Sequence, residues 1–98
     1  MMPGNFLHLG INFIEKPPTS EAREEIEEIL NGAKDWYRYA PDCWIIYTHQ
    51  TAKTWHERLK KIPWMAKQRY FIVKIDIDDR SGWLLQDTWD WLKKDRES

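Results

Sequence analysis

The stretch KDWYRYAPDCWIIYTH, residues 34–49, constrains the fold more than any other part of this chain. Five of its residues are aromatic, and the pair Pro41-Asp42 lies in its middle. A single strand of that length with an internal proline is unusual, because proline cannot donate to a strand ladder. Proline followed by aspartate instead favours a type I turn. The stretch therefore predicts an antiparallel hairpin with strands over Asp35–Tyr39 and Cys43–Thr48.

The register of this hairpin decides which face of the sheet each side chain occupies. A tight turn at Pro41-Asp42 pairs Tyr39 with Trp44, and it places Tyr37 and Ile46 on the same face as that pair. The residues predicted for the opposite face are Trp36, Arg38, Cys43, Ile45 and Tyr47. A three-residue loop would exchange the faces of one strand, because side chains alternate along a strand.

Alternating residues predict one strand before the hairpin and another near the end of the chain. In NFLHLGINF, one face carries Leu7, Leu9, Ile11 and Phe13. The opposite face carries Phe6, His8, Gly10 and Asn12. In RYFIVKIDID, the set predicted to face the core is Phe71, Val73, Ile75 and Ile77. The set predicted for the opposite face is Tyr70, Ile72, Lys74 and Asp76.

Apolar residues at helical spacing predict two helices between these strands. Thr19 or Ser20 suits the N-cap of the first helix, and Thr51 suits that of the second, which Pro63 ends. The apolar positions of the two helices are Ala22, Ile26, Ile29, Leu30, Ala33, Ala52, Trp55, Leu59 and Ile62. The Trp-rich segment over residues 83–94 predicts a terminal helix, either alone or after a short strand.

The order β-α-β-β-α-β predicts an α+β fold of the ferredoxin-like type, formed by residues 1–98 as one domain. Both helices then cover one face of a four-stranded antiparallel sheet, and a helical tail of about residues 81–98 follows. The other face is left open. We expect the tail, a second copy of the chain or a nucleic acid to cover this face, because large apolar patches rarely stay in contact with water.

The element order, together with WYRYAPDCWIIYT, YFIVKI and a late Trp91-Leu92-Lys93, resembles a known group of proteins. These are the SinR-like small bacterial proteins, relatives of the small CRISPR-associated endoribonuclease that is the second numbered Cas protein. The resemblance implies a ferredoxin-like fold that often forms a homodimer. Active members of the wider group carry a metal-binding aspartate at the end of the first strand, where this chain has Asn12. Asparagine lacks the negative charge that holds a hard divalent cation, so the resemblance implies no catalytic site here.

Charged residues are segregated along the chain, although the formal net charge is only -1. Residues 53–74 carry seven Lys or Arg and one Glu, whereas residues 1–52 carry four Lys or Arg and eight Asp or Glu. Basic charge mixed with aromatic residues suits phosphate contacts and base stacking. The residues predicted for nucleic-acid binding are Lys60, Lys61, Trp64, Lys67 and Arg69. The alternative is that this basic segment balances the acidic first helix within the molecule.

Other reactive side chains give no recognisable site. His8 is predicted to lie on the open face, and none of the histidines has a metal-binding spacing such as H-E-x-x-H. Cys43, the only cysteine, favours a structural thiol in a reducing cytoplasm. Asp76 and Asp78 share a strand face and either hold Mg²⁺ or form a solvated strand end. No cofactor, metal or membrane segment is predicted, and enzymatic activity is not expected.

Two hypotheses for function follow. The first is a non-catalytic interaction module, homodimeric or bound to another protein, that uses the aromatic open face. The residues predicted for this interface are Phe6, His8, Trp36, Arg38, Ile45, Tyr47, Tyr70 and Ile72. The alternative is a protein that binds RNA or DNA, or a degenerate metal-dependent ribonuclease, that uses the basic segment 53–74.

Overall fold

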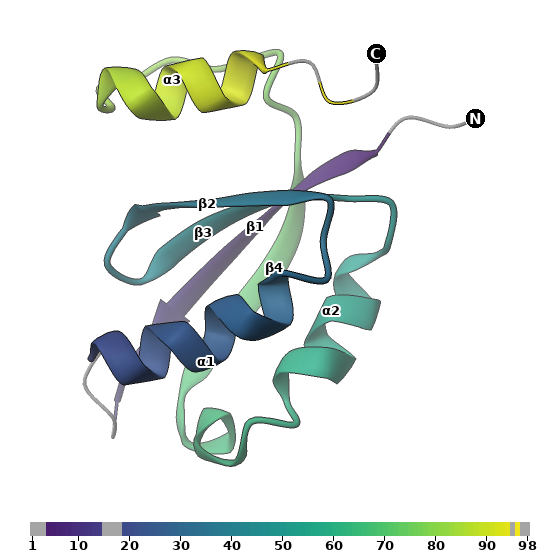
Figure 1. Cartoon of the computed structure of the whole chain (residues 1–98), viewed down its shortest axis with the longest axis vertical. Coiled ribbons are helices and arrows are strands. Elements are labelled where there is room, and N and C mark those ends of the chain that lie inside the picture. The colour runs from purple at the N-terminus through teal and green to yellow at the C-terminus, as the bar shows by residue number, and fades with distance from the viewer. Residues whose placement is uncertain (1–3, 15–18, 95, 97–98) are drawn as a thin grey trace.

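The computed structural model describes residues 4–14, 19–94 and 96, and shows an α+β protein (Figure 1). Four strands form one antiparallel sheet in the order β2-β3-β1-β4. The strands are β1 (Asn5–Asn12), β2 (Asp35–Ala40), β3 (Cys43–Thr48) and β4 (Arg69–Ile75). The helices are α1 (Ser20–Leu30), α2 (Ala52–Leu59), the 3-10 helix η1 (Pro63–Lys67) and α3 (Gln86–Lys93). The prediction of an α+β fold with a four-stranded antiparallel sheet is therefore confirmed.

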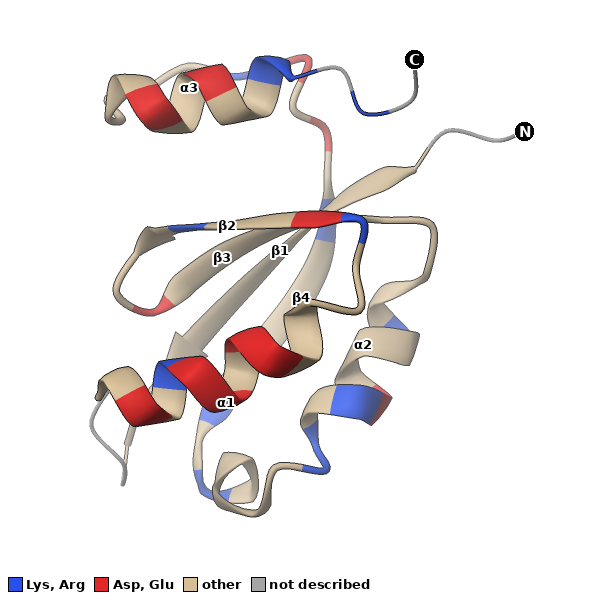
Figure 2. Ribbon diagram, in the orientation of Figure 1, with Lys and Arg blue, Asp and Glu red and all other residues tan. Residues whose placement is uncertain are grey.

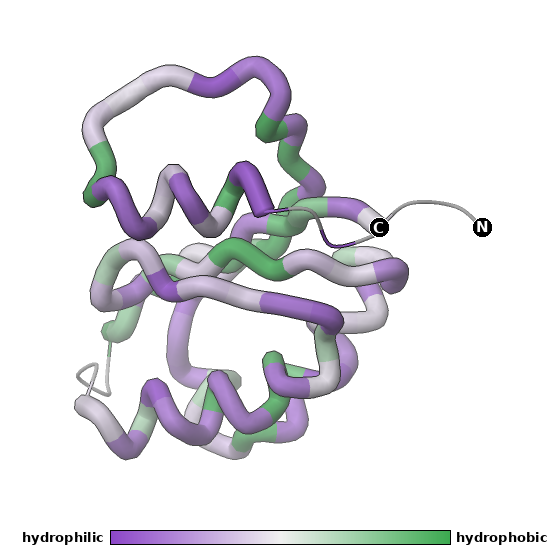
Figure 3. Tube along the Cα trace, turned by 45° about the horizontal axis from the view of Figure 1, so that its top comes forward, coloured by the Kyte–Doolittle hydropathy of each residue, from purple (hydrophilic) through white to green (hydrophobic). Residues whose placement is uncertain are grey.

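The sheet is covered on both faces by different parts of the chain. α1 and α2 lie side by side on one face, and α3 lies on the other (Figure 1). The chain after β4 rises away from the sheet before α3 returns over it, as the tube in Figure 3 shows. The tail thus covers part of its own sheet.

Side-chain caps fix the beginnings of the two helices on the first face. The Thr19 hydroxyl accepts a hydrogen bond from the Ala22 amide at 3.2 Å, and Thr51 accepts one from the Thr54 amide at 3.3 Å. Each bond satisfies one of the amides that a helix N-terminus leaves without a partner. α2 ends at Leu59, earlier than the predicted end, and η1 then begins at Pro63, whose missing amide is tolerated in a first turn.

The main hydrophobic core lies between the sheet and the pair α1 and α2. Its largest members are two tryptophans, Trp44 of β3 and Trp55 of α2, both fully buried. Each indole N–H has an acceptor: Trp44 donates to Glu27 at 3.0 Å, and Trp55 donates to Thr48 at 3.2 Å. A buried indole without an acceptor would lose stability, so these polar partners allow tryptophan to fill the core.

The predicted faces are correct for β1 and β3 but wrong for β2. Trp36 lies opposite Ile46, and Arg38 lies opposite Trp44, so both belong to the face covered by α1 and α2. The turn has two residues as predicted, because Ala40 lies opposite Cys43. The register then shifts between Arg38 and Ala40, as it does where a bulge inserts one residue. The inserted residue exchanges the faces of the rest of β2.

The predicted faces of β4 are also exchanged. Tyr70 and Ile72 pack against the main core, and Lys74 lies opposite Leu7 on the same side. The residues on the opposite face are Phe71, Val73 and Ile75. Both sets in β4 contain large apolar residues, so the alternation alone could not decide between them. The register with β1 decides it, because Gly10 lies opposite Phe71.

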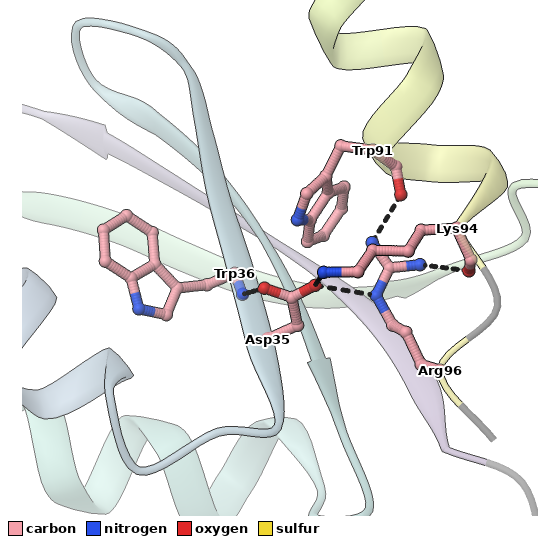
Figure 4. Close-up of polar contacts among 5 residues, drawn as sticks. All are labelled: Asp35, Trp36, Trp91, Lys94 and Arg96. Carbon is pink, nitrogen blue, oxygen red and sulfur yellow. Dashed lines mark hydrogen bonds and ion pairs between the residues drawn. The ribbon is translucent and has the colours of Figure 1, made fainter. Parts of the chain in front are cut away.

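A cluster around Arg96 attaches α3 and the chain end to the sheet (Figure 4). The Arg96 guanidinium pairs with Asp35 at 3.0 Å, donates to the Trp91 carbonyl oxygen, and stacks 4.1 Å from the Trp91 ring centre. The Trp91 ring in turn packs against Phe6 and Tyr37. Lys94 lies 3.7 Å from the same Asp35 carboxylate. The Arg96 side chain is only 4% exposed, so its charge is compensated by close partners rather than by water.

The terminal helix forms only the later part of the segment 83–94, and no short strand precedes it in residues 83–85. Leu85 is the N-cap, so Trp83, Leu84 and Leu85 precede α3 and are exposed. Leu92 of α3 is buried.

We expect the substitution Arg96→Gln to lower the free energy of unfolding by about 1.5–3 kcal/mol, the usual range for hydrogen bonds that involve charged groups. Loss of these contacts should also free α3, so that proteases cleave residues 76–85 faster. Chemical denaturation and limited proteolysis measure the two effects. Lys93→Gln is the matched control, because Lys93 is exposed in the last turn of α3. Equal behaviour of the two variants would contradict the assigned role of Arg96.

Candidate functional site

The predicted interface residues divide between the two faces of the sheet. Four of them, Phe6, His8, Ile45 and Tyr47, lie on the α3 face as predicted. Phe6 and Tyr47 are in contact with each other and with Arg96, so the tail covers them. The part of this face that the structure leaves accessible is therefore smaller than the sequence predicted.

The other four predicted interface residues do not lie on the open face, so their predicted placement is wrong. They lie on the face that α1 and α2 cover. Trp36 donates to Asn31 at 2.8 Å, and Arg38 lies 3.6 Å from Glu27. Tyr70 is hydrogen-bonded to His56 at 2.8 Å. Ile72 packs against the main core. These side chains are partners of α1, α2 and the core rather than an exposed interface.

The accessible part of the α3 face lies along β4, which is an edge strand. Phe71 is 60% exposed and Val73 is 41% exposed. In the described part of the chain, β4 is paired only with β1, so its outer backbone edge has no strand partner. Edge strands present unpaired amide and carbonyl groups, and proteins usually protect them with bulges, proline, short length or charged side chains. In β4 the charged side chains are Arg69 and Lys74, near its two ends. The described β4 is a regular seven-residue strand, and its sequence RYFIVKI contains no proline.

A hollow of about 520 Å³ lies on the same face, over the end of β1. We call it the sheet hollow; its walls are formed by His8, Gly10, Asn12, Asp42, Cys43, Arg69 and Phe71, together with the backbone of Ile11 and Tyr70. Gly10 lies directly between Cys43 on β3 and Phe71 on β4. Because glycine has no side chain, the backbone of β1 forms the floor between the Cys43 thiol and the Phe71 ring.

The rings of His8 and Phe71 explain why a larger residue at position 10 is unfavourable. A Cβ atom added to Gly10 would lie 3.3 Å from the His8 ring and 3.4 Å from the Phe71 ring. Both distances are short for carbon contacts, and any longer side chain would extend into the hollow. Glycine within a strand often marks a place where another group approaches the backbone closely.

A row of hydrogen-bonded polar side chains borders the sheet hollow. The His8 Nε2 atom lies 2.5 Å from the Tyr39 hydroxyl, and the Cys43 thiol lies 3.5 Å from Asp42 Oδ1, within the longer range of sulfur hydrogen bonds. The Tyr39 hydroxyl also interacts with the Cys43 sulfur. If the Tyr39 hydroxyl donates to His8 Nε2, then His8 Nδ1 carries the proton. Nδ1 lies 3.8 Å from the Cβ position of Gly10, at the border of the hollow.

Burial determines the protonation of His8, Tyr39 and Cys43 at neutral pH. Desolvation lowers the pKa of His8 below its ordinary value of 6.5, which favours the neutral imidazole. Desolvation, together with the Cys43 partner, raises the pKa of Tyr39 to about 12. Desolvation also raises the pKa of Cys43, so this thiol is not activated as a nucleophile. These three side chains therefore offer neutral hydrogen-bonding groups rather than charged ones.

The residues predicted for nucleic-acid binding are less available than the sequence suggested. Trp64 donates to Glu25 at 2.7 Å and packs against Phe13, so its ring is part of the contact between η1 and α1. Lys60 pairs with Glu57 at 2.7 Å. Lys61, Lys67 and Arg69 are exposed. Figure 2 shows acidic residues concentrated on α1 and basic ones on α2, on η1 and near β4.

The structure brings no metal-binding cluster together among the residues it describes. No group of three or more His, Cys, Asp or Glu side chains in those residues is close enough to hold a metal ion. The Asp76 carboxylate, for which the sequence left Mg²⁺ binding and a solvated strand end open, accepts a hydrogen bond from the Asp78 amide at 2.9 Å. Asn12 is exposed at the end of β1 and lines the sheet hollow.

Comparison with known proteins adds no assignment: neither a protein-family model, nor a curated protein, nor a solved structure matches this chain. In the described part of the chain, none of the helices has the length and apolar character needed to cross a membrane.

Sequence reasoning missed the sheet hollow. It placed Gly10, Cys43 and His8 on one face correctly. It assigned Phe71 and Tyr39 wrongly to the other face, which packs on the core. The glycine within β1 was the available signal, because glycine weakens a strand interior and often has a specific reason there. The partners that complete the hollow come from β4 and from the register shift in β2, which no local pattern specifies.

We expect His8 to make stability depend on pH. Because its folded pKa lies below 6.5, the unfolded chain binds more protons in the window between the two values. The contribution of neutral His8 to folding stability is therefore fully present above pH 6.5. It is lost as the pH falls towards the pKa of His8 in the folded protein. Replacing His8 by Gln removes this component, so the stability difference between wild type and variant should shrink on acidification. Urea unfolding between about pH 7.5 and about pH 5 measures it.

The control is His49→Gln, since His49 is exposed. A wild-type advantage over the His8 variant that stays constant across this pH range would contradict the assignment.

Proposed function

We propose that this protein is a non-catalytic interaction module that forms a homodimer through the outer edge of β4. The observation that carries this proposal is the exposure of Phe71 and Val73 on a regular edge strand without a bulge or proline. Pairing with another strand would satisfy the free backbone groups of this edge and remove both side chains from water. The sequence-based hypothesis of an aromatic interface on this face is thus kept, with its location moved to β4.

A second copy of the chain is the partner that fits this edge best. In an antiparallel pair of β4 strands related by a twofold axis, full overlap of Arg69–Ile75 places the axis at Ile72. Phe71 then lies opposite the partner's Val73, so the two exposed apolar residues meet. Tyr70 lies opposite the partner's Lys74, where a cation can contact an aromatic side chain. No two cations of β4 lie directly opposite each other, so the pairing avoids like-charge repulsion.

We also propose that the fold is of the ferredoxin-like type. Its support is the order β2-β3-β1-β4 of antiparallel strands, with α1 and α2 on one face. This proposal agrees with the resemblance to the SinR-like small bacterial proteins. The helix α3 and the Arg96 cluster are additions on the other face, and they leave the edge of β4 free for the proposed dimer.

We expect Val73→Lys to convert the dimer to a monomer. An added cation at this position would lie beside the partner's Phe71 and would lose hydration on pairing. Analytical ultracentrifugation across a range of protein concentrations measures the molecular mass. The matched control is Ile14→Lys, because Ile14 is a 51% exposed apolar residue outside β4. A wild-type protein that sediments as a monomer at all concentrations would refute the proposal, as would dissociation by both substitutions alike.

Nucleic-acid binding is a second candidate function. Its support is the set of exposed basic side chains on one side of the molecule, near α2, η1 and β4, which includes Lys61 and Arg69 (Figure 2). Trp64 is removed from the predicted contact set, because it packs between η1 and α1. Phosphate contacts of exposed Lys and Arg release counterions, so binding should fall steeply with salt.

For this candidate we expect Lys61→Glu to weaken binding of single-stranded RNA and to reduce its salt dependence, because one phosphate contact is lost. Fluorescence anisotropy at several salt concentrations measures both quantities. The control is Lys93→Glu on α3, on the other side of the sheet. Equal weakening by both variants would indicate net charge alone and would remove the candidate.

A further inference from the structure

The sheet hollow has the size and the lining of a small-molecule site. Its volume of about 520 Å³ lies within the range of roughly 300–1,000 Å³ that is typical for ligand pockets. The walls combine one exposed aromatic ring with polar groups from three different strands and a turn, and convergent polar groups of this kind can fix the orientation of a ligand. Among these polar groups only Arg69 also belongs to the strand pair of the proposed dimer, and none belongs to the main core.

The floor and the aromatic wall favour a flat ligand. Adjacent strands lie about 4.8 Å apart, so Cys43 and Phe71 are separated by about 10 Å across Gly10. The His8 and Phe71 rings approach the Cβ position of Gly10 to 3.3 Å and 3.4 Å, so the space left between Phe71 and Cys43 is narrow and suits a flat group. There it contacts the Phe71 ring, for which offset or edge-to-face packing is favourable. Phe71 is 60% exposed in the structure, so its ring is accessible for such a contact.

The polar groups at the border differ between the two sides of β1. Arg69 lies opposite Asn12 on the β4 side, and both side chains belong to the α3 face because they alternate with Tyr70 and Ile11. Asp42 lies on the β3 side, where its backbone carbonyl accepts from the Ile11 amide. The hollow thus has a guanidinium on one side and a carboxylate on the other. This arrangement suits a ligand that carries an anion at one edge and N–H donors at the opposite edge.

From this arrangement we propose that the sheet hollow binds a small planar amino-aromatic anion. Its ring lies over Gly10 against Phe71, its carboxylate or phosphate faces Arg69 and Asn12, and its N–H donors face Asp42. The His8 ring borders the end of the hollow and offers a further hydrogen bond to the ring edge. An aminobenzoate and a nucleoside monophosphate share this chemistry. Each copy of the chain contains the complete hollow, so this proposal does not depend on dimer formation.

Two probes test the proposal and distinguish the source of the anion. 4-Aminobenzoate provides a carboxylate and AMP a phosphate, and each is titrated into ¹⁵N-labelled protein while amide shifts are followed by NMR. Benzoate lacks the N–H donors, whereas aniline, adenosine and inorganic phosphate each provide one part of the chemistry. We expect saturable shifts at Gly10 and Phe71 with at least one complete probe, and weaker or absent shifts with its fragments. Selectivity for one probe identifies a carboxylate or a phosphate ligand.

Variants locate the site. Arg69→Gln should weaken binding of the complete probe by roughly tenfold or more, because a charge-assisted hydrogen bond is lost. It should leave binding of the matched neutral fragment, aniline or adenosine, nearly unchanged. Lys61→Gln, another exposed cation that does not line the hollow, is the control and should have no effect. Asp42→Asn should reduce the preference for 4-aminobenzoate over benzoate, or for AMP over inorganic phosphate.

Three results would overturn the proposal. The first is the absence of saturable shifts at Gly10 and Phe71 with both complete probes at millimolar concentration. The second is equal binding of a complete probe and its anion alone, which would show general anion attraction. The third is equal weakening by Arg69→Gln and Lys61→Gln. Thermal unfolding of each variant confirms that it is folded, so that loss of binding is not a consequence of unfolding.

Discussion

The register shift at Tyr39 is the constraint on which the α3 face depends. Without it, the alternation of β2 would direct Asp35 and Tyr37 towards α1 and α2. With it, Asp35 lies opposite Tyr47 and pairs with Arg96, and Tyr37 contacts Trp91. The inserted residue, Tyr39, reaches His8. One extra residue in an edge strand therefore provides both the attachment of the tail and the polar border of the sheet hollow.

The two faces of the sheet consequently have different physical roles. The face under α1 and α2 is a closed core in which Trp44 and Trp55 have hydrogen-bond acceptors. The other face is closed only where α3 and Arg96 cover it, and it remains accessible along β4 and over Gly10. The proposed dimer uses the edge of β4, and the proposed ligand uses the hollow beside it. Phe71 belongs to both, so occupation of one site can influence the other.

Local sequence patterns were sufficient to predict the strands and helices. They were insufficient to predict which face of the sheet each side chain occupies. Period-two alternation and capping residues predicted all four strands and the starts of α1 and α2, because these features depend on neighbours in the sequence. The faces of β2 and β4 were predicted wrongly. In both strands, both alternating sets contain large apolar residues, so burial gives no clear preference. The side chains of Trp36 and Tyr70 show the consequence, since each has a polar partner from a helix on the core face.

The sequence by itself determined the α+β class, the hairpin at Pro41-Asp42, the antiparallel sheet and the segregation of acidic and basic residues. Each follows from local periodicity, turn chemistry or charge. Only the tertiary structure decided that the tail covers its own sheet, that Trp64 is packed rather than exposed, and that Cys43, Gly10 and Phe71 lie in one row. These features depend on the pairing of strands that are far apart in the chain. A shift of one residue in such a pairing moves every side chain to the other face.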